Sequence, residues 1–234
     1  MGIAAGNRAM MGKPAQSELN GAQMSRTTLA LIACGTLGGI LFALVYLIEG
    51  ATRSGYIAWQ QAISALSLGP GGWVQQVNFV AFGLLTLCSA LGWRRALTPG
   101  AGSAWYPILK LGSGLGLIMD GFFSQDPVPG YPVGAVLTPP TFHGEIHEIF
   151  AFVSITSIAL GEFVLAWRFA REPRWHVWVI PAVITGLLTI VFIALFGASG
   201  AHGGIAGVYE RIATGVNSFL GIAILTRLLL DLKQ

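Results

Sequence analysis

The sequence predicts an all-α fold: a bundle of six transmembrane helices with both termini cytoplasmic and a short interfacial helix in the 1–2 loop. Six apolar stretches, each about twenty residues long, divide the chain. A hydrocarbon core about 30 Å thick needs about 20 apolar residues per helix, and the stretches do not alternate as barrel strands do. Of the 234 residues, 54% are hydrophobic and 10% are charged, against about 25% charged residues in soluble domains.

The apolar stretches place the transmembrane helices at 28–49, 74–92, 104–123, 146–167, 176–197 and 208–230. Residues 1–27 combine basic residues with scattered glycine and alanine, and we expect a disordered cytoplasmic leader there. Residues 28–234 should form a single six-helix transmembrane domain, because such short loops leave no room for a second, soluble domain.

Basic residues indicate the orientation of the bundle. Alternating the predicted helices puts nearly all lysines and arginines on one side and leaves Arg53 and Arg211 on the other. Cytoplasmic loops are enriched in these residues, so both termini should be cytoplasmic. The net charge of +3 is then a topology signal. The chain has no basic stripe with interleaved aromatic residues, so nucleic acid is not an expected partner.

Two loops on the extracytoplasmic side have distinctive sequences. Segment 56–68 intersperses apolar and polar residues and predicts the short helix at the membrane interface. Loop 124–141 contains five prolines. It should be stiff and non-helical, a lid over the outer end of the bundle.

Acidic and histidine side chains gather on the same side. Six of the ten acidic residues and three of the four histidines lie in the outer loops or at outer helix ends. Asp120 and Glu210 should lie within the helices, where ionisable groups are costly and usually functional. This distribution predicts a functional site at the extracytoplasmic face.

The sharpest local motif is HGEIHE at 143–148. His143 and His147 are four residues apart and would share one helix face, the spacing of paired metal ligands. A divalent metal such as zinc would need a further ligand, and the candidates are Asp120, Asp126, His202 and Glu210. Neutral imidazole beside a carboxylate also suits general acid–base catalysis.

A structural interpretation of the same motif is open. Thr141 can cap the helix, and Glu145 and Glu148 would then complement the positive end of the helix dipole. Asp126 precedes a proline and could simply begin a turn. Arg211 is unfavourable at a helix N-terminus, so we expect it to pair with Asp120 or Asp126.

Two further charges lie inside predicted helices near the cytoplasmic side. Lys110 and Glu162 are each about seven residues from the inner end of their helix. Because their depths match, we expect direct or water-bridged contact between them.

Five short motifs together resemble the domain-of-unknown-function 998 family of prokaryotic integral membrane proteins. They are SerGlyTyr at 54–56, GlnAlaIleSerAlaLeu at 61–66, AspPro at 126–127, HisGlyGluIleHis at 143–147 and GluArgIle at 210–212. The resemblance implies a compact multi-helix fold in a prokaryotic cytoplasmic (inner) membrane. The matching positions are Ser64, Asp126, His143, His147, Glu210 and Arg211. It supplies no chemistry.

These patterns favour a membrane-embedded enzyme, hydrolase-like and metal-dependent or acid–base, acting on a membrane lipid or an amphipathic small molecule. Its candidate catalytic residues are Ser64, Asp120, Asp126, His143, His147, Glu210 and Arg211, with His143, His147 and Asp120 as metal ligands. The competing hypothesis is a non-catalytic accessory or ligand-binding subunit with membrane-protein partners. A transporter comes third, because the spans lack a chain of mid-membrane ionisable groups.

Overall fold

The computed structural model describes residues 24–199 and 204–231, which form six α-helices and no β-strand. Their bounds are α1 Arg26–Thr52, α2 Trp73–Leu97, α3 Trp105–Phe122, α4 Phe142–Phe169, α5 Val179–Ala198 and α6 Ala206–Asp231. Two short 3-10 helices lie between them, η1 at Ile63–Ser67 and η2 at Pro173–Trp178. All six predicted stretches are confirmed as helical. Most of the predicted leader lies outside the described residues.

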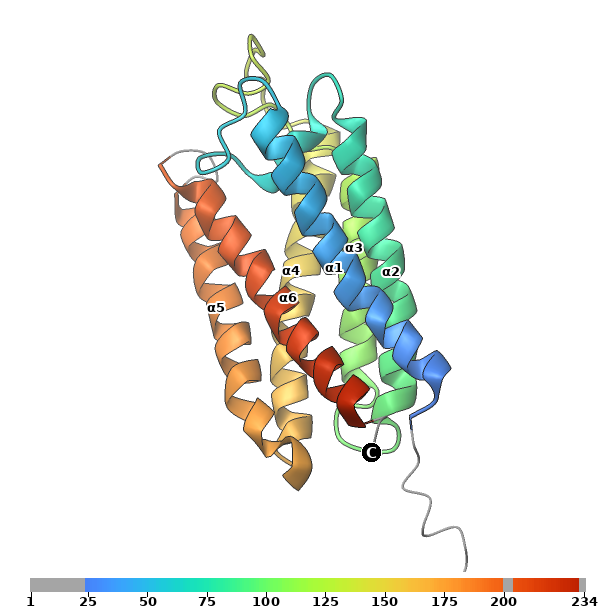
Figure 1. The fold of residues 1–234 in the computed structure, drawn as a ribbon. Helices are drawn as coiled ribbons and strands as arrows, with labels where there is room; N and C mark the ends of the chain where they lie inside the picture. Colours follow the sequence, from blue (N-terminus) through green and yellow to red (C-terminus); the bar gives the residue numbers. More distant parts are fainter. Residues whose placement is uncertain (1–23, 200–203, 232–234) are drawn as a thin grey trace, which may run out of the picture.

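Five of these helices are long and apolar enough to cross a membrane: α1, α2, α4, α5 with η2, and α6. The remaining helix, α3, has 18 residues, about 27 Å at about 1.5 Å per residue. It is less apolar because it contains Lys110, Asp120 and several glycines. It nevertheless packs between α2 and α4 as a full member of the bundle (Figure 1).

The helices run up and down in sequence order and close into a ring. Each packs against the next, and α6 packs back against α1. The 1–2 and 3–4 loops lie at one end of the bundle, and residues 24 and 231 lie at the other (Figure 1). We call these the outer and inner ends, following the predicted orientation. The first and last described residues therefore lie at the same end of the bundle.

Glycines allow the backbones to approach closely. A Cβ on Gly83 of α2 would lie 2.6 Å from the carbonyl oxygen of Gly114 in α3, and one on Gly35 of α1 would lie 2.6 Å from Ser89 Oγ in α2. Small residues at helix interfaces are the usual means of packing in membranes, where water supplies no hydrophobic driving force between helices.

The 1–2 loop folds into the bundle. Of the predicted interfacial helix over 56–68, only η1 is helical, and all five of its residues are buried. Ile63 and Leu66 join Phe42, Phe79 and Leu117 in an apolar cluster. The segment therefore folds between the helices and covers the outer end of the bundle.

The proline-rich 3–4 loop is non-helical, as predicted. Val128 and Tyr131 anchor it, because both are buried and Tyr131 packs edge-on against Tyr56 at 5.4 Å between ring centroids. Farther along the loop, Val133 and Val136 are largely exposed. The loop thus covers part of the 1–2 loop, while the apolar side chains at its own tip stay exposed.

Candidate functional site

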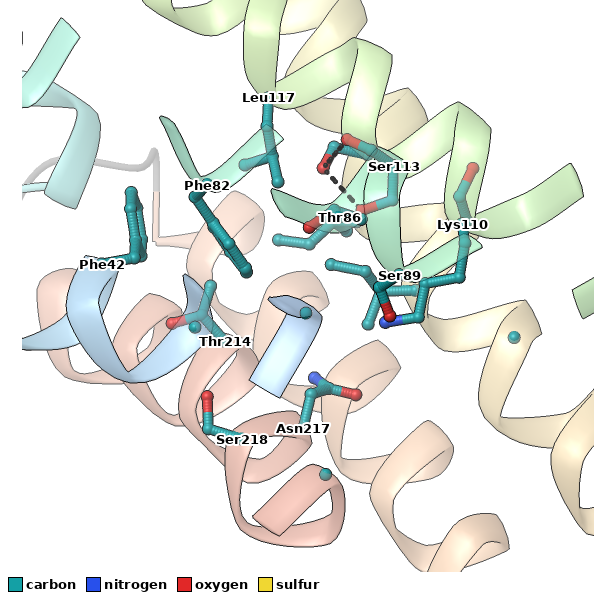
Figure 2. Close-up of a pocket in the computed structure, with 18 of the residues that line it drawn as sticks. Phe42, Phe82, Thr86, Ser89, Lys110, Ser113, Leu117, Thr214, Asn217 and Ser218 are labelled. Atoms are coloured by element: carbon teal, nitrogen blue, oxygen red, sulfur yellow. Dashed lines mark hydrogen bonds between the residues drawn. The ribbon is translucent and has the colours of Figure 1, made fainter. Parts of the chain in front are cut away.

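A cavity of about 170 Å³ lies among the helices of the bundle. Side chains of α1, α2, α3, α4, α6 and η1 line it, and α5 contributes none. Figure 2 shows part of its wall, with side chains from several helices converging on one space. The volume is close to that of an engineered protein cavity of about 150 Å³ that binds benzene. It is large enough for a small molecule or for part of a larger one.

His147 and Asp120 form the outer end of this cavity. Their exposed fractions are 2% and 3%. His147 Nδ1 lies 2.8 Å from the carbonyl oxygen of Phe123 and 3.6 Å from Asp120 Oδ1. A carbonyl can only accept, so Nδ1 carries the proton and Nε2 of the neutral ring is a free base. Asp120 Oδ1 has no hydrogen-bond donor among the described residues.

Glu210 and Ser64 join the same end, and both hold η1 in place. Glu210 Oε2 accepts a hydrogen bond from the Ile63 backbone N–H at 2.6 Å. Ser64 Oγ donates to Gln125 Oε1. Both residues line the cavity, so the structure brings four of the seven predicted catalytic residues together here: Ser64, Asp120, His147 and Glu210.

Arg211 does not pair with Asp120 or Asp126, so that expectation is wrong. It donates to the Tyr56 hydroxyl at 2.6 Å and to the carbonyl oxygens of Gln61 and Gly207 at 3.1 and 2.8 Å. Backbone carbonyls of the 1–2 loop supply the partner that the sequence pattern did not reveal. Burial raises the pKa of the Tyr56 phenol above its usual value, although Arg211 opposes the shift.

Asp126 supports the start of α4 and lies outside the cavity. Its carboxylate accepts from the Thr141 backbone N–H at 2.9 Å and from Thr141 Oγ1 at 2.6 Å. Thr141 is the N-cap of α4 and accepts from the Gly144 N–H at 3.2 Å. This is the capping arrangement of the structural interpretation, and Asp126 takes part in it.

His143 also lies outside the cavity. Its side chain is exposed and packs against Phe123, with ring centroids 5.1 Å apart. Among the described residues, no three His, Cys, Asp or Glu side chains are placed to hold a metal ion. The predicted His143, His147 and Asp120 metal site is therefore not assembled there, because the two imidazoles point to different surroundings. His202 lies outside the described residues.

An apolar band and a polar inner chamber follow below the outer site. Phe42, Phe82 and Leu117 form the band, with Phe42 and Phe82 stacked at 5.1 Å between centroids. Hydroxyl and amide side chains line the space beneath it, together with Lys110 and Glu162. No hydrogen bond or ion pair joins Lys110 to Glu162 in the described part of the chain, so the predicted direct contact is not made. A water-bridged contact stays a prediction.

Sequence reasoning missed this chamber. The available signal was the spacing of polar residues inside the spans, such as Thr214, Asn217 and Ser218 in α6, which are three and four residues apart and share a helix face. Ser113 and Ser154 likewise meet across α3 and α4, with Ser154 Oγ donating to the Ser113 carbonyl at 3.2 Å.

The fold and the cavity define a multi-pass membrane protein with buried polar groups at its centre. The family model described as a protein of unknown function (DUF998) matches residues 36–227. The chain belongs to this family, as the resemblance indicated. No curated protein and no solved structure matches it.

Proposed function

We propose that the protein is a membrane-embedded enzyme that acts by acid–base chemistry on an amphipathic, lipid-like substrate in the central cavity. One observation carries this proposal: His147 keeps its Nδ1 on the Phe123 carbonyl, which leaves Nε2 as the basic nitrogen of the ring, and the ring lies beside a buried carboxylate whose Oδ1 has no donor among the described residues. Buried, unpaired ionisable groups inside a membrane protein are costly and usually functional.

Hydrolysis is the reaction that these groups support best. His147 Nε2 takes a proton from a water molecule, and the oxygen of that water attacks the acyl carbon. The imidazolium then returns the proton to the leaving alcohol. Asp120 stabilises the imidazolium through its nearby carboxylate. The Ser64 hydroxyl donates to the Gln125 amide oxygen and not to a base, so the proposal assigns the attack to water.

The cavity supports entry of an amphipathic molecule from the outer end. Ile63 and Ser64 of η1 cover the cavity at that end, and the polar groups beside them are Tyr46, Asp120, His147 and Glu210. We extend the proposal to the topology: all six helices cross a cytoplasmic membrane, both termini are cytoplasmic, and the site faces the extracytoplasmic side.

A short-chain chromogenic ester tests the enzyme proposal. Purified protein in nanodiscs should hydrolyse p-nitrophenyl octanoate faster than empty nanodiscs do. His147→Gln and Asp120→Asn should each lower the rate by roughly 10²-fold or more, the usual scale of general acid–base catalysis. His176→Ala, an exposed histidine at the inner end, is the matched control and should keep the full rate.

The competing proposal is a non-catalytic ligand-binding or accessory subunit, for which membrane-protein partners are expected. The structural use of Ser64, Asp126 and Arg211 favours it. Wild-type protein that binds octanoate but hydrolyses neither the octanoate ester nor a longer homologue would replace the enzyme proposal with this one.

A further inference from the structure

The inner chamber contains two opposite charges that do not meet. Lys110 comes from α3 and Glu162 from α4, and both line the cavity. Glu162 is 7% exposed, and its Oε2 has no hydrogen-bond donor among the described residues. Lys110 Nζ has no acceptor there either, and lies 5.8 Å from the centroid of the Tyr106 ring.

The order of residues along the helices separates this chamber from the outer site. On α3, Asp120 is followed inward by Leu117, Ser113 and Lys110, and ten residues correspond to about 15 Å. The apolar band of Phe42, Phe82 and Leu117 therefore lies between the two charged regions. In Figure 2 these three side chains lie on one side of the space, and Lys110 and Ser89 lie on the other.

The chamber walls offer hydrogen-bonding side chains among apolar ones. Thr86, Ser89, Ser113 and Ser154 line it from three helices, and Thr214 and Asn217 from a fourth. Asn217 Nδ2 donates to Thr189 Oγ1 at 3.0 Å, but its Oδ1 has no donor. A buried acceptor without a donor costs free energy, and more when it is charged. A guest that supplies donors near Glu162 and an acceptor near Lys110 would remove this cost.

From this geometry we infer that the inner chamber is a binding site for a zwitterionic group, with its ammonium on Glu162 and its anionic end on Lys110. The hydroxyl walls complete the hydrogen bonding. The same chemistry could come from a free small molecule or from a zwitterionic lipid headgroup. The site goes beyond the proposed enzyme, because none of its residues takes part in the His147 chemistry.

Calorimetry on the full chain in phosphatidylglycerol nanodiscs tests the site with three soluble probes. Phosphoethanolamine carries both charges, ethanolamine only the cation and inorganic phosphate only the anion. Phosphoethanolamine should bind about ten-fold or more tightly than either single-charge probe, because it makes both charge-assisted contacts. Lys110→Met and Glu162→Gln should each weaken that binding by about ten-fold or more. Glu145→Gln, an exposed carboxylate, should leave it unchanged.

A lipid arm distinguishes the two sources. If the guest is a headgroup, exchange of phosphatidylglycerol for phosphatidylethanolamine should raise the unfolding midpoint of the wild type but not of Glu162→Gln. Single variants that fail to fold are replaced by the double variant Lys110→Met/Glu162→Gln, which buries no charge and should fold without binding. Equal binding of all three probes, or no response to any probe or lipid, would overturn the inference. The ester assay at His147 is independent of either result.

Discussion

Gly144, at the outer end of α4, leaves room for the carboxylate of Asp126. A Cβ at this position would lie 2.1 Å from Asp126 Oδ2. Gly144→Ala must therefore displace the carboxylate that holds Thr141, and we expect a loss of about 1–3 kcal/mol in unfolding free energy from the broken cap. The unfolding midpoint in detergent measures it.

Gly215→Ala is the control for that change, because a Cβ there meets nothing within 4 Å. Since alanine favours a helix over glycine by about 0.5–1 kcal/mol, this variant should match or exceed the wild type. If Gly144→Ala were equally stable, the carboxylate contact would not hold the cap.

Arg211 is a second single residue with a large expected effect. It joins α6 to the 1–2 loop through the Tyr56 hydroxyl and the Gln61 carbonyl. Lysine cannot reproduce this planar set of donors, so Arg211→Lys should lower the unfolding free energy by about 1.5–3 kcal/mol, the contribution of hydrogen bonds from a charged group. Arg174→Lys, at an exposed inner-loop residue, should leave the unfolding midpoint within experimental error. A similar loss in both variants would show that the loop contacts are not responsible.

The sequence predicted that these residues lie at one end of the bundle, as they do, but it did not predict their partners. Glu210 was expected as a candidate metal ligand beside the histidines and Arg211 as the partner of a carboxylate, whereas both bind the backbone of the 1–2 loop. Every residue carries a backbone carbonyl, and every residue except proline carries an N–H, so no side-chain pattern marks which one a charged group will reach. His143 shows the same limit, because helical spacing puts it near His147 while its ring turns to the surface.

At the scale of elements, η1 closes the outer end of the cavity and is held there by the contact from Ile63 to Glu210. In a variant lacking Cys34 and Cys88, a cysteine replacing the fully buried Ala65 should resist a water-soluble maleimide. Adding Glu210→Ala should speed the labelling by about ten- to a hundred-fold, because one hydrogen bond to a charged group is lost.

A cysteine replacing the exposed Ser54 controls for reagent access and should react equally in both backgrounds. If Ala65→Cys reacts at the same slow rate with and without Glu210, then other contacts hold η1 in place.

The helices were predictable because the thickness of a membrane sets their length and apolar content. The cavity could not be predicted from the sequence, for a physical reason. A serine or threonine in a transmembrane helix can satisfy its hydroxyl on its own helix, as Thr214 does on the Glu210 carbonyl at 3.0 Å. A polar residue in a span therefore does not reveal whether it faces a neighbour, lipid or a cavity until the helices are packed.

At the scale of the whole molecule, the charge asymmetry leads to a topology test. A cysteine at Gly134 should react with a membrane-impermeant reagent added outside intact cells, and one at Pro173 should not. Both positions are exposed and lie at opposite ends of the bundle. The reverse pattern would put the His147 end of the cavity in the cytoplasm.

The closure of the ring by α6 against α1 also has a consequence for biogenesis. The cavity wall needs side chains from both helices, and α6 is the last described helix to leave the ribosome. Until it inserts, Asp120, Lys110 and Glu162 face an open slot where lipid tails would meet them, at an energetic cost. A nascent chain that stops before α6 is therefore a natural target for membrane quality control.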